Sequence, residues 1–289
     1  MSLKRYRGCG GDFTYVHLMS RVVQPTYFGE HYPFDEDDKD YMVSLLSRLD
    51  GLFCLDVLAY CFMDNHFHVI IRIEKDAEKL IKPPEVKKRY EEFYSGKRQI
   101  DARTHKCHVL RSHLNDFSYW MWMFLRMSSF RHNNKFKRRG ALWQDGFKSV
   151  VLEDAKALST CLKYVELNPV RAKMVSNPMN YQWSSWGVMK FSGIHPYRQR
   201  IVDSLRQVYE IGAEQSDAEV FSTYSKELRA LVNCQSVDEA SLISLLSETI
   251  YTCLLKANPK LTRYNRLRLS SRRRGNGLNG MAKRPLPLV

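Results

Sequence analysis

The sequence contains no uninterrupted apolar run near the ~20 residues that a membrane-spanning helix requires, so we expect no membrane partner. The first residues, MSLKRYRGCGGDF, include no apolar core of the kind that defines a signal peptide. The seven cysteines are scattered and form no CxxC pair, which favours a reducing compartment over a disulfide framework. We therefore predict a cytoplasmic protein.

Acidic residues are scarce relative to basic ones, and the formal net charge is +14. Beyond Glu248 there is no acidic residue, whereas ten lysines and arginines follow. This balance favours a partner with dense negative charge, with nucleic acid as the first candidate and an ordinary basic soluble protein as the alternative. We expect the basic segment from Arg263 to Arg274 to bind nucleic acid without sequence specificity, and the protein to associate with the nucleoid.

With 289 residues, of which 44% are hydrophobic, the chain can form one domain of ordinary size and a smaller one. We expect a first domain at residues 1–195 and a helical extension with a basic tail at residues 196–289. Asp38 and Asp154 are expected to cap their helices, and Gly51 to end the first helix. The patterns predict strands at 13–20, 55–63, 66–73 and 147–152, and helices at 38–49, 115–131, 154–168, 203–211, 218–232 and 237–255.

The segment from Tyr60 to Ile73, YCFMDNHFHVIIRI, is the most informative part of the chain. Apolar, β-prone residues flank Asp64-Asn65, which is a turn signal, so the pattern predicts a hairpin whose second strand starts at His66. Because side chains alternate along a strand, His66 and His68 lie on one face, and the apolar residues between and after them face a core. Two imidazoles at this spacing can bind one metal ion, although a structural role for such a pair is common.

Residues 79–111 are expected to form a basic, partly helical insertion, in which Pro83-Pro84 interrupts any helix early. The insertion can contact a phosphate backbone or form a solvated surface. His105, Cys107, His108 and His113 suggest a zinc site, but their spacing matches no familiar one, and we disfavour it.

The helix expected at 115–131 carries aromatic residues at helical spacing, among them Trp120 and Phe124. Such residues can form a platform for stacking bases, but at this spacing they more often belong to a core, which is our prediction. The helix leads into a basic loop at residues 131–140, RHNNKFKRRG.

The helix expected at 154–168 ends before Pro169, because a residue that precedes proline disfavours helical backbone. Tyr164 and Asn168 are four residues apart and are therefore expected one above the other on the same face. Each also has an ordinary alternative role, since a phenol can lie at the surface of a packed helix and an asparagine can cap its end.

Together these segments resemble the HUH single-tyrosine transposases, and among them most closely the REP-associated tyrosine transposases. The resemblance covers about residues 10–190. It implies an α+β fold, with a ferredoxin- or RRM-like central antiparallel sheet and helices on one face. The blocks that carry it, in the family's order, are Met19-Ser20-Arg21, Met63 to His68 (MDNHFH), Leu142 to Ser149 (LWQDGFKS), Tyr164 to Ala172 (YVELNPVRA) and Tyr181 to Trp186 (YQWSSW).

The resemblance also implies a role for each candidate site residue. His66 and His68 would bind Mg²⁺ or Mn²⁺, Asn168 would complete the metal site, and Tyr164 would attack a DNA phosphodiester and form a 5′-phosphotyrosine link. A phenol with a pKa near ~10 is a weak nucleophile at neutral pH, and a metal ion on the scissile phosphate stabilises the transition state. Imidazole ligands by themselves suit Mn²⁺ or Zn²⁺ better than Mg²⁺.

The partner that the resemblance implies is single-stranded or hairpin DNA, such as a repetitive extragenic palindrome, and the family allows a homodimer. Two residues depart from the family pattern. Asp64 stands where relatives often have proline, which adds a carboxylate near the metal or shapes the turn, and Glu166 stands where relatives often have histidine. The basic residues expected to hold DNA are Arg21, Arg131, Lys135, Lys137, Arg138, Arg139, Lys148 and Arg171.

The leading prediction is a metal-dependent single-strand DNA endonuclease and strand transferase. The alternative from another class is a non-catalytic protein that binds structured nucleic acid with the same sheet and basic surface. A third prediction is a metal-dependent phosphodiesterase that uses water and forms no protein–DNA link.

Overall fold

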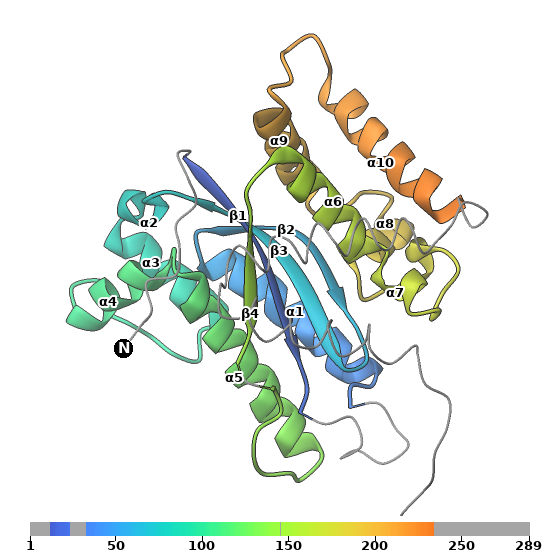
Figure 1. Ribbon diagram of the computed structural model, residues 1–289. Coiled ribbons are helices and arrows are strands. Elements are labelled where there is room, and N and C mark those ends of the chain that lie inside the picture. Colours follow the sequence, from blue (N-terminus) through green and yellow to red (C-terminus); the bar gives the residue numbers. More distant parts are fainter. Residues whose placement is uncertain (1–11, 24–32, 145, 234–289) are drawn as a thin grey trace, which may run out of the picture.

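The computed structural model describes residues 12–23, 33–144 and 146–233 (Figure 1). The helix expected at 237–255 and the basic segment at 263–274 lie outside the described residues. The strands are β1 (Phe13–Arg21), β2 (Leu55–Phe62), β3 (His66–Glu74) and β4 (Lys148–Leu152). The described helices are α1 (Glu36–Leu52), α2 (Ala77–Leu80), α3 (Pro83–Phe93), α4 (His105–His113), α5 (Phe117–Lys135), α6 (Ala155–Glu166), α7 (Asn168–Arg171), the 3₁₀ helix η2 (Pro178–Asn180), α8 (Ser185–Ser192), α9 (Arg198–Tyr209) and α10 (Asp217–Asn233).

The four strands form one sheet in the order β2-β3-β1-β4, in which all neighbours are antiparallel. β3 therefore lies between β1 and β2, which run in the same direction and are joined through α1. The predicted hairpin of β2 and β3 is present, and β3 begins at His66 as expected. The α+β class of the prediction is confirmed.

Helices cover both faces of the sheet, which corrects the expectation that they lie on one face (Figure 1). Phe67 and His68 are adjacent on β3 and point to opposite faces. The ring of Phe67 lies 4.9 Å from that of Phe124 on α5, whereas the ring of His68 lies 5.5 Å from that of Tyr164 on α6. β2 and most of β3 are buried almost without interruption, as in strands that are covered on both sides.

Helix α1 extends beyond both of its predicted ends. Its N-cap is Asp35 rather than Asp38, because Oδ1 of Asp35 accepts the backbone N–H of Asp38 at 2.9 Å. Three acidic residues follow in the first turn, where negative charge suits the helix dipole. Gly51 does not end the helix, which continues to Leu52, and the side chain of Leu52 is buried in the core.

Residues 79–111 are largely helical, and α3 packs between α1 and α4. Pro83 and Pro84 begin α3 instead of interrupting a helix, because a proline in the first turn needs no N–H donor. Val86, Tyr90 and Phe93 form the buried side of this helix. The insertion is therefore a packed layer with a basic outer surface.

Helix α5 begins after Asp116, whose carboxylate accepts the N–H groups of Ser118 and Tyr119. The core prediction is confirmed for Trp120 and Phe124, which are fully buried. Trp122 on the same helix is instead 48% exposed.

The predicted helix at 154–168 consists of two helices. Asp154 caps α6 as expected, with its Oδ1 accepting the N–H of Ala157 at 2.7 Å. α6 ends at Glu166, and α7 begins at Asn168 with proline in its first turn. The residue between them, Leu167, keeps a helical hydrogen bond from its N–H to the carbonyl of Lys163 at 2.9 Å, so the interruption is slight.

Helix α9 packs on α6 and β2, and α10 packs on α9. Tyr15 on β1 donates its hydroxyl to Gln207 at 2.9 Å, and Arg200 contacts Asp50 at 2.7 Å. The division into domains at residues 195 and 196 stays a prediction. Within residues 12–23, 33–144 and 146–233, no helix has the length and apolar character needed to cross a membrane.

Candidate metal and tyrosine site

The candidate site lies where β3 begins and β1 ends, on the face of the sheet that α6 covers. His66 pairs with Arg21 and His68 pairs with Met19 in the β1–β3 register. Residues opposite one another in an antiparallel pair share a face, so Arg21 lies on the same face as both histidines. The rings of His66 and His68 are 5.1 Å apart and nearly perpendicular.

A third histidine, which the sequence alone did not indicate as a site residue, contacts His68. His17 lies on β1 and is completely buried, and its Nε2 is 2.9 Å from Nδ1 of His68. His66 donates its own Nδ1–H to Oδ1 of Asn65 at 2.6 Å. Both candidate ligands are thus held through Nδ1. This arrangement is typical of metal-binding histidines, which anchor one nitrogen and leave the other for the ion.

The three imidazoles are neutral at physiological pH because of their burial. Desolvation and, second, the charge of Arg21 lower the pKa of His66 to about 4. Desolvation lowers the pKa of His17 to about 3, and desolvation together with its neighbours His17 and His66 lowers the pKa of His68 well below its ordinary value. Only the neutral imidazole can bind a metal ion, so the site keeps its ligands in the required form.

Tyr164 reaches the histidines from α6. Its ring lies 5.5 Å from that of His68 and 6.1 Å from that of His17, in both cases edge to face. The side chain is only partly buried. The fold thereby brings together residues almost a hundred positions apart, as the sequence analysis expected.

Asn168 is buried, and its side chain lies beside the imidazole of His66. Its buried Nδ2 has no hydrogen-bond partner among the described residues. Because Nδ1 of His66 donates its proton to Oδ1 of Asn65, Nε2 of His66 carries a free lone pair. This lone pair and the amide oxygen of Asn168 are donor types that Mn²⁺ or Mg²⁺ can bind. The residues present therefore fit a divalent metal ion.

Arg171, on α7, lies over the ring of Tyr164, with its guanidinium carbon 4.5 Å from the ring centroid. Its Nε is buried and has no hydrogen-bond partner among the described residues. Its charge and that of Arg21 both act on His68 and lower its pKa. Arg171 beside Tyr164 and Arg21 opposite His66 give the site a positive field that is suited to a phosphate group.

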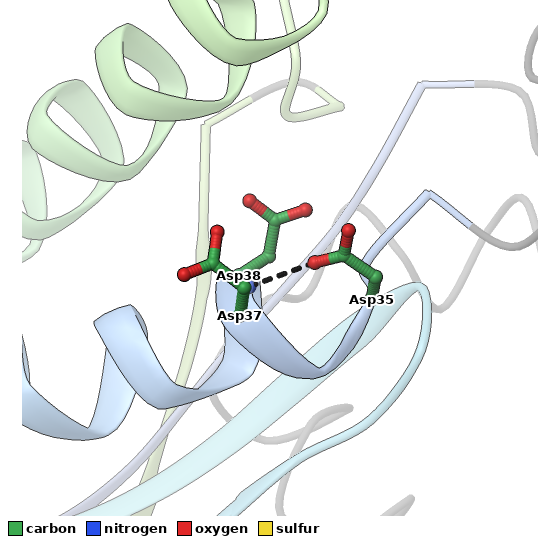
Figure 2. A group of neighbouring side chains, drawn as sticks. All are labelled: Asp35, Asp37 and Asp38. Atoms are coloured by element: carbon green, nitrogen blue, oxygen red, sulfur yellow. Dashed lines mark hydrogen bonds between the residues drawn. The ribbon is translucent and has the colours of Figure 1, made fainter.

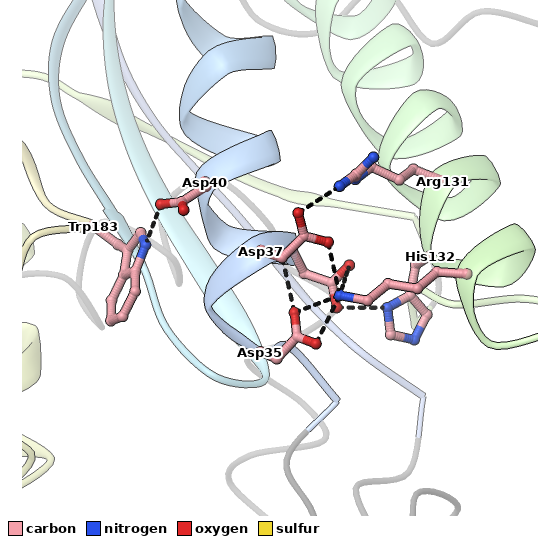
Figure 3. Close-up of polar contacts among 8 residues, drawn as sticks. Asp35, Asp37, Asp40, Arg131, His132 and Trp183 are labelled. Atoms are coloured by element: carbon pink, nitrogen blue, oxygen red, sulfur yellow. Dashed lines mark hydrogen bonds and ion pairs between the residues drawn. The ribbon is translucent and has the colours of Figure 1, made fainter.

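Two of the basic residues expected to hold DNA are engaged in ion pairs (Figure 3). Lys135 contacts Asp35 at 2.7 Å and Asp37 at 2.9 Å, and Arg131 contacts Asp37 at 2.8 Å. Their carboxylate partners lie about a hundred residues earlier in the chain, so local charge patterning did not reveal them. Of the remaining expected residues, Arg138 is partly buried, whereas Lys137, Arg139 and Lys148 are exposed.

Asp35, Asp37 and Asp38 form an acidic group at the start of α1 (Figure 2). In the described part of the chain, it is the one group of three or more His, Cys, Asp or Glu residues whose ligand atoms all lie within 4.8 Å of one another. Its charge is already compensated by the cations of α5, and Asp38 also contacts Nδ1 of His132 at 3.2 Å. We assign the group to joining α1 and α5. His105, Cys107, His108 and His113 do not form a group of this kind.

The two departures from the family pattern both have structural partners. Asp64 forms an ion pair with buried Lys39 at 2.8 Å, which favours a role in shaping the turn. Glu166 is completely buried and accepts hydrogen bonds from Ser185 at 2.5 Å, from the N–H of Trp186 at 2.9 Å and from His195 at 3.2 Å. Glu166 therefore ties α6 to α8 and to the segment that precedes α9.

Comparisons with known proteins give little further information. No family model matches the chain, and no curated protein sequence matches it. The chain has a distant structural likeness to a REP-associated tyrosine transposase bound to a REP hairpin, with 13% sequence identity and a TM-score of 0.42, over 68% of this chain and 90% of that one. At this level the likeness does not assign the chain to a family.

Proposed function

We propose that the protein is a metal-dependent enzyme that nicks and rejoins single-stranded DNA beside a hairpin, with Tyr164 as the nucleophile. The observation that carries the proposal is the convergence of Tyr164 with His68, Asn168 and Arg171 at one end of the sheet. A helix that only packed on the sheet would not need a phenol between an imidazole and a guanidinium group.

The chemistry follows from the groups present. His66, His68 and Asn168 would hold Mg²⁺ or Mn²⁺, which withdraws charge from the scissile phosphate when bound. Arg171 lies next to the phenol and is placed to hold a phosphate oxygen. The oxygen of Tyr164 forms a bond to phosphorus while the bond to the 3′ oxygen breaks, and overall one proton passes from the phenol to the 3′ oxygen. The products are a 5′-phosphotyrosine and a free 3′-hydroxyl, so the bond energy is kept for rejoining.

The strand order supports the finer classification of the fold. In a ferredoxin- or RRM-like sheet, a third strand lies between the two strands of a β-α-β unit, and β3 has this position between β1 and β2. We propose that the sheet belongs to this class, with extra helices on its second face. Tyr164 lies beside histidines of its own chain, so the proposed site needs no second subunit, and the homodimer stays a prediction.

The test is a denaturing gel of the full chain with labelled hairpin DNA that carries a single-stranded flank, with and without Mn²⁺. We expect a metal-dependent protein–DNA adduct that is lost in Tyr164→Phe and in His66→Ala. Tyr209→Phe removes an exposed hydroxyl at the end of α9 and is the matched control. Cleavage without an adduct, unchanged in Tyr164→Phe, would identify a hydrolase, and DNA binding without either product would identify a non-catalytic binding protein.

A further inference from the structure

A cleft of about 440 Å³ lies on the side of the molecule away from Tyr164, between α5 and the segment that precedes β4. Aromatic and apolar side chains form most of its lining, and none of the described residues that line it is acidic. Its main lining residues are Trp122, Leu125, Arg126, Trp143 and Phe147. Such a cleft has the size and composition of a site for a flat aromatic group.

Stacked rings continue from this cleft along the outer face of α5. The ring of Trp122 lies parallel to that of Tyr119, at 5.4 Å and 18°, and Tyr119 stacks on His113 at 4.5 Å and 24°. The guanidinium carbon of Arg126 lies 5.1 Å from the centre of the Trp122 ring. The Trp122 side chain is nevertheless 48% exposed, so part of its ring remains open to a ligand.

We propose that this cleft binds unpaired bases of a single-stranded nucleic acid. Exposed aromatic rings beside arginine are the elements with which proteins stack bases and neutralise the adjoining phosphates. The net charge of the chain is +14, which favours a negatively charged polymer over an uncharged apolar peptide as the occupant. Arg126 supplies the positive charge at the cleft itself.

The position of the cleft suggests which bases it holds, and this part of the inference rests on the proposed function. β4 is an edge strand, and its first residue, Lys148, pairs with Met19, which in turn pairs with His68. Lys148 therefore lies two strands from His68, about 10 Å away at the usual strand spacing. Phe147 of the cleft immediately precedes Lys148. A strand that leaves the tyrosine site over the edge of β4 would reach the cleft, so we assign it to the single-stranded flank of the hairpin.

The fluorescence of the chain can report on this cleft directly. Of its five tryptophans, Trp122 is the one with substantial exposure, because the others are at most 8% exposed. In the Tyr164→Phe background, which prevents covalent chemistry, we expect homothymidine single strands to quench this fluorescence. The quenching should disappear in Trp122→Phe, which keeps a stacking ring and should keep most of the affinity.

Trp122→Ala should weaken binding of the single strand by about tenfold, or about 1.4 kcal/mol, with duplex binding unchanged. Phe191→Ala removes an exposed aromatic ring on α8 and should bind as the parent does. Equal affinity of Trp122→Ala and its parent would overturn the proposal, as would quenching that persists in Trp122→Phe. The adduct assay is a separate readout: an adduct with no effect of Trp122 rejects only the cleft, and an effect of Trp122 with no adduct rejects only the proposed chemistry.

Discussion

His17 and His68 are joined by a buried hydrogen bond of 2.9 Å between Nε2 of the first and Nδ1 of the second. The bond fixes the orientation of the His68 ring and directs its Nε2 towards the site. For His68 to bind a metal ion through Nε2, its proton must lie on Nδ1 and be donated to His17. His17 is therefore a positioning residue for the proposed metal site.

Replacement of His17 should weaken metal binding while leaving both proposed imidazole ligands in place. We expect His17→Gln to bind Mn²⁺ about 10–100-fold more weakly than the unaltered chain, the usual effect of removing such a partner. Isothermal titration calorimetry on the full chain measures this affinity without substrate. His195→Gln alters another fully buried histidine, which bonds to Glu166 instead, and should leave the affinity unchanged. Equal losses in the two variants would contradict the assignment.

The buried imidazoles should also make folding sensitive to acid. The folded-state pKa is about 4 for His66 and about 3 for His17, below the ordinary value of 6.5, so the unfolded chain binds protons more readily. Their contribution to stability is complete above pH 6.5 and is lost as the pH falls towards these values. Urea unfolding at several pH values should show a slope for His17→Gln that is shallower by up to about 1.4 kcal/mol per pH unit. Identical slopes would show that His17 is not held in the neutral form.

The ion pairs of Lys135 distinguish this last residue of α5 from the exposed basic residues of the loop that follows. Because Lys135 is bound to Asp35 and Asp37, we expect Lys135→Ala to reduce stability slightly and to leave DNA binding nearly unchanged. Arg139 is exposed, and Arg139→Ala should weaken binding and lower the slope of log affinity against log salt by about 0.9 for one lost phosphate contact. Fluorescence anisotropy over a salt series distinguishes them. The reverse pattern would mean that DNA displaces the carboxylates.

Two glycines offer a matched test of how closely α8, which Glu166 joins to α6, packs on Tyr181. A Cβ on Gly187 of α8 would lie 1.8 Å from the carbonyl oxygen of Tyr181, whereas a Cβ on Gly51 of α1 would meet no atom within 4 Å. Gly187→Ala should therefore destabilise the fold by about 1–3 kcal/mol or more, and Gly51→Ala should stabilise it by up to about 1 kcal/mol. Thermal unfolding of the two variants measures both. A tolerated alanine at 187 would show that α8 can move away from Tyr181.

Much of the site could be anticipated from local sequence patterns. The turn at Asp64-Asn65 and the alternation that follows it predict the strand and the shared face of His66 and His68. Asp154 and Pro169 predict the helix that carries Tyr164 and its approximate end. The placement of Tyr164 beside His68 came from the family resemblance, because spacing along the chain does not say which face of a sheet a later helix covers.

The features that were missed all depend on long-range pairing. His17 alternates with Met19 and Arg21 on one face of β1. A histidine within an otherwise apolar strand could have indicated a site residue. Its contact with His68 follows only from the register of β1 against β3. The neutralisation of Lys135 and the second helical layer likewise depend on segments that are distant in the sequence.

The most direct measurement of the central claim is the location of the covalent link. The full chain is incubated with Mn²⁺ and hairpin DNA, digested with nuclease and trypsin, and analysed by mass spectrometry. Cleavage after Lys163 and Arg171 yields the peptide YVELNPVR, residues 164–171, in which Tyr164 is the one hydroxyl-bearing side chain. We predict a nucleotide attached to this peptide at Tyr164 in the presence of metal. A nucleotide on another residue, or cleaved DNA with this peptide unmodified, would contradict the account.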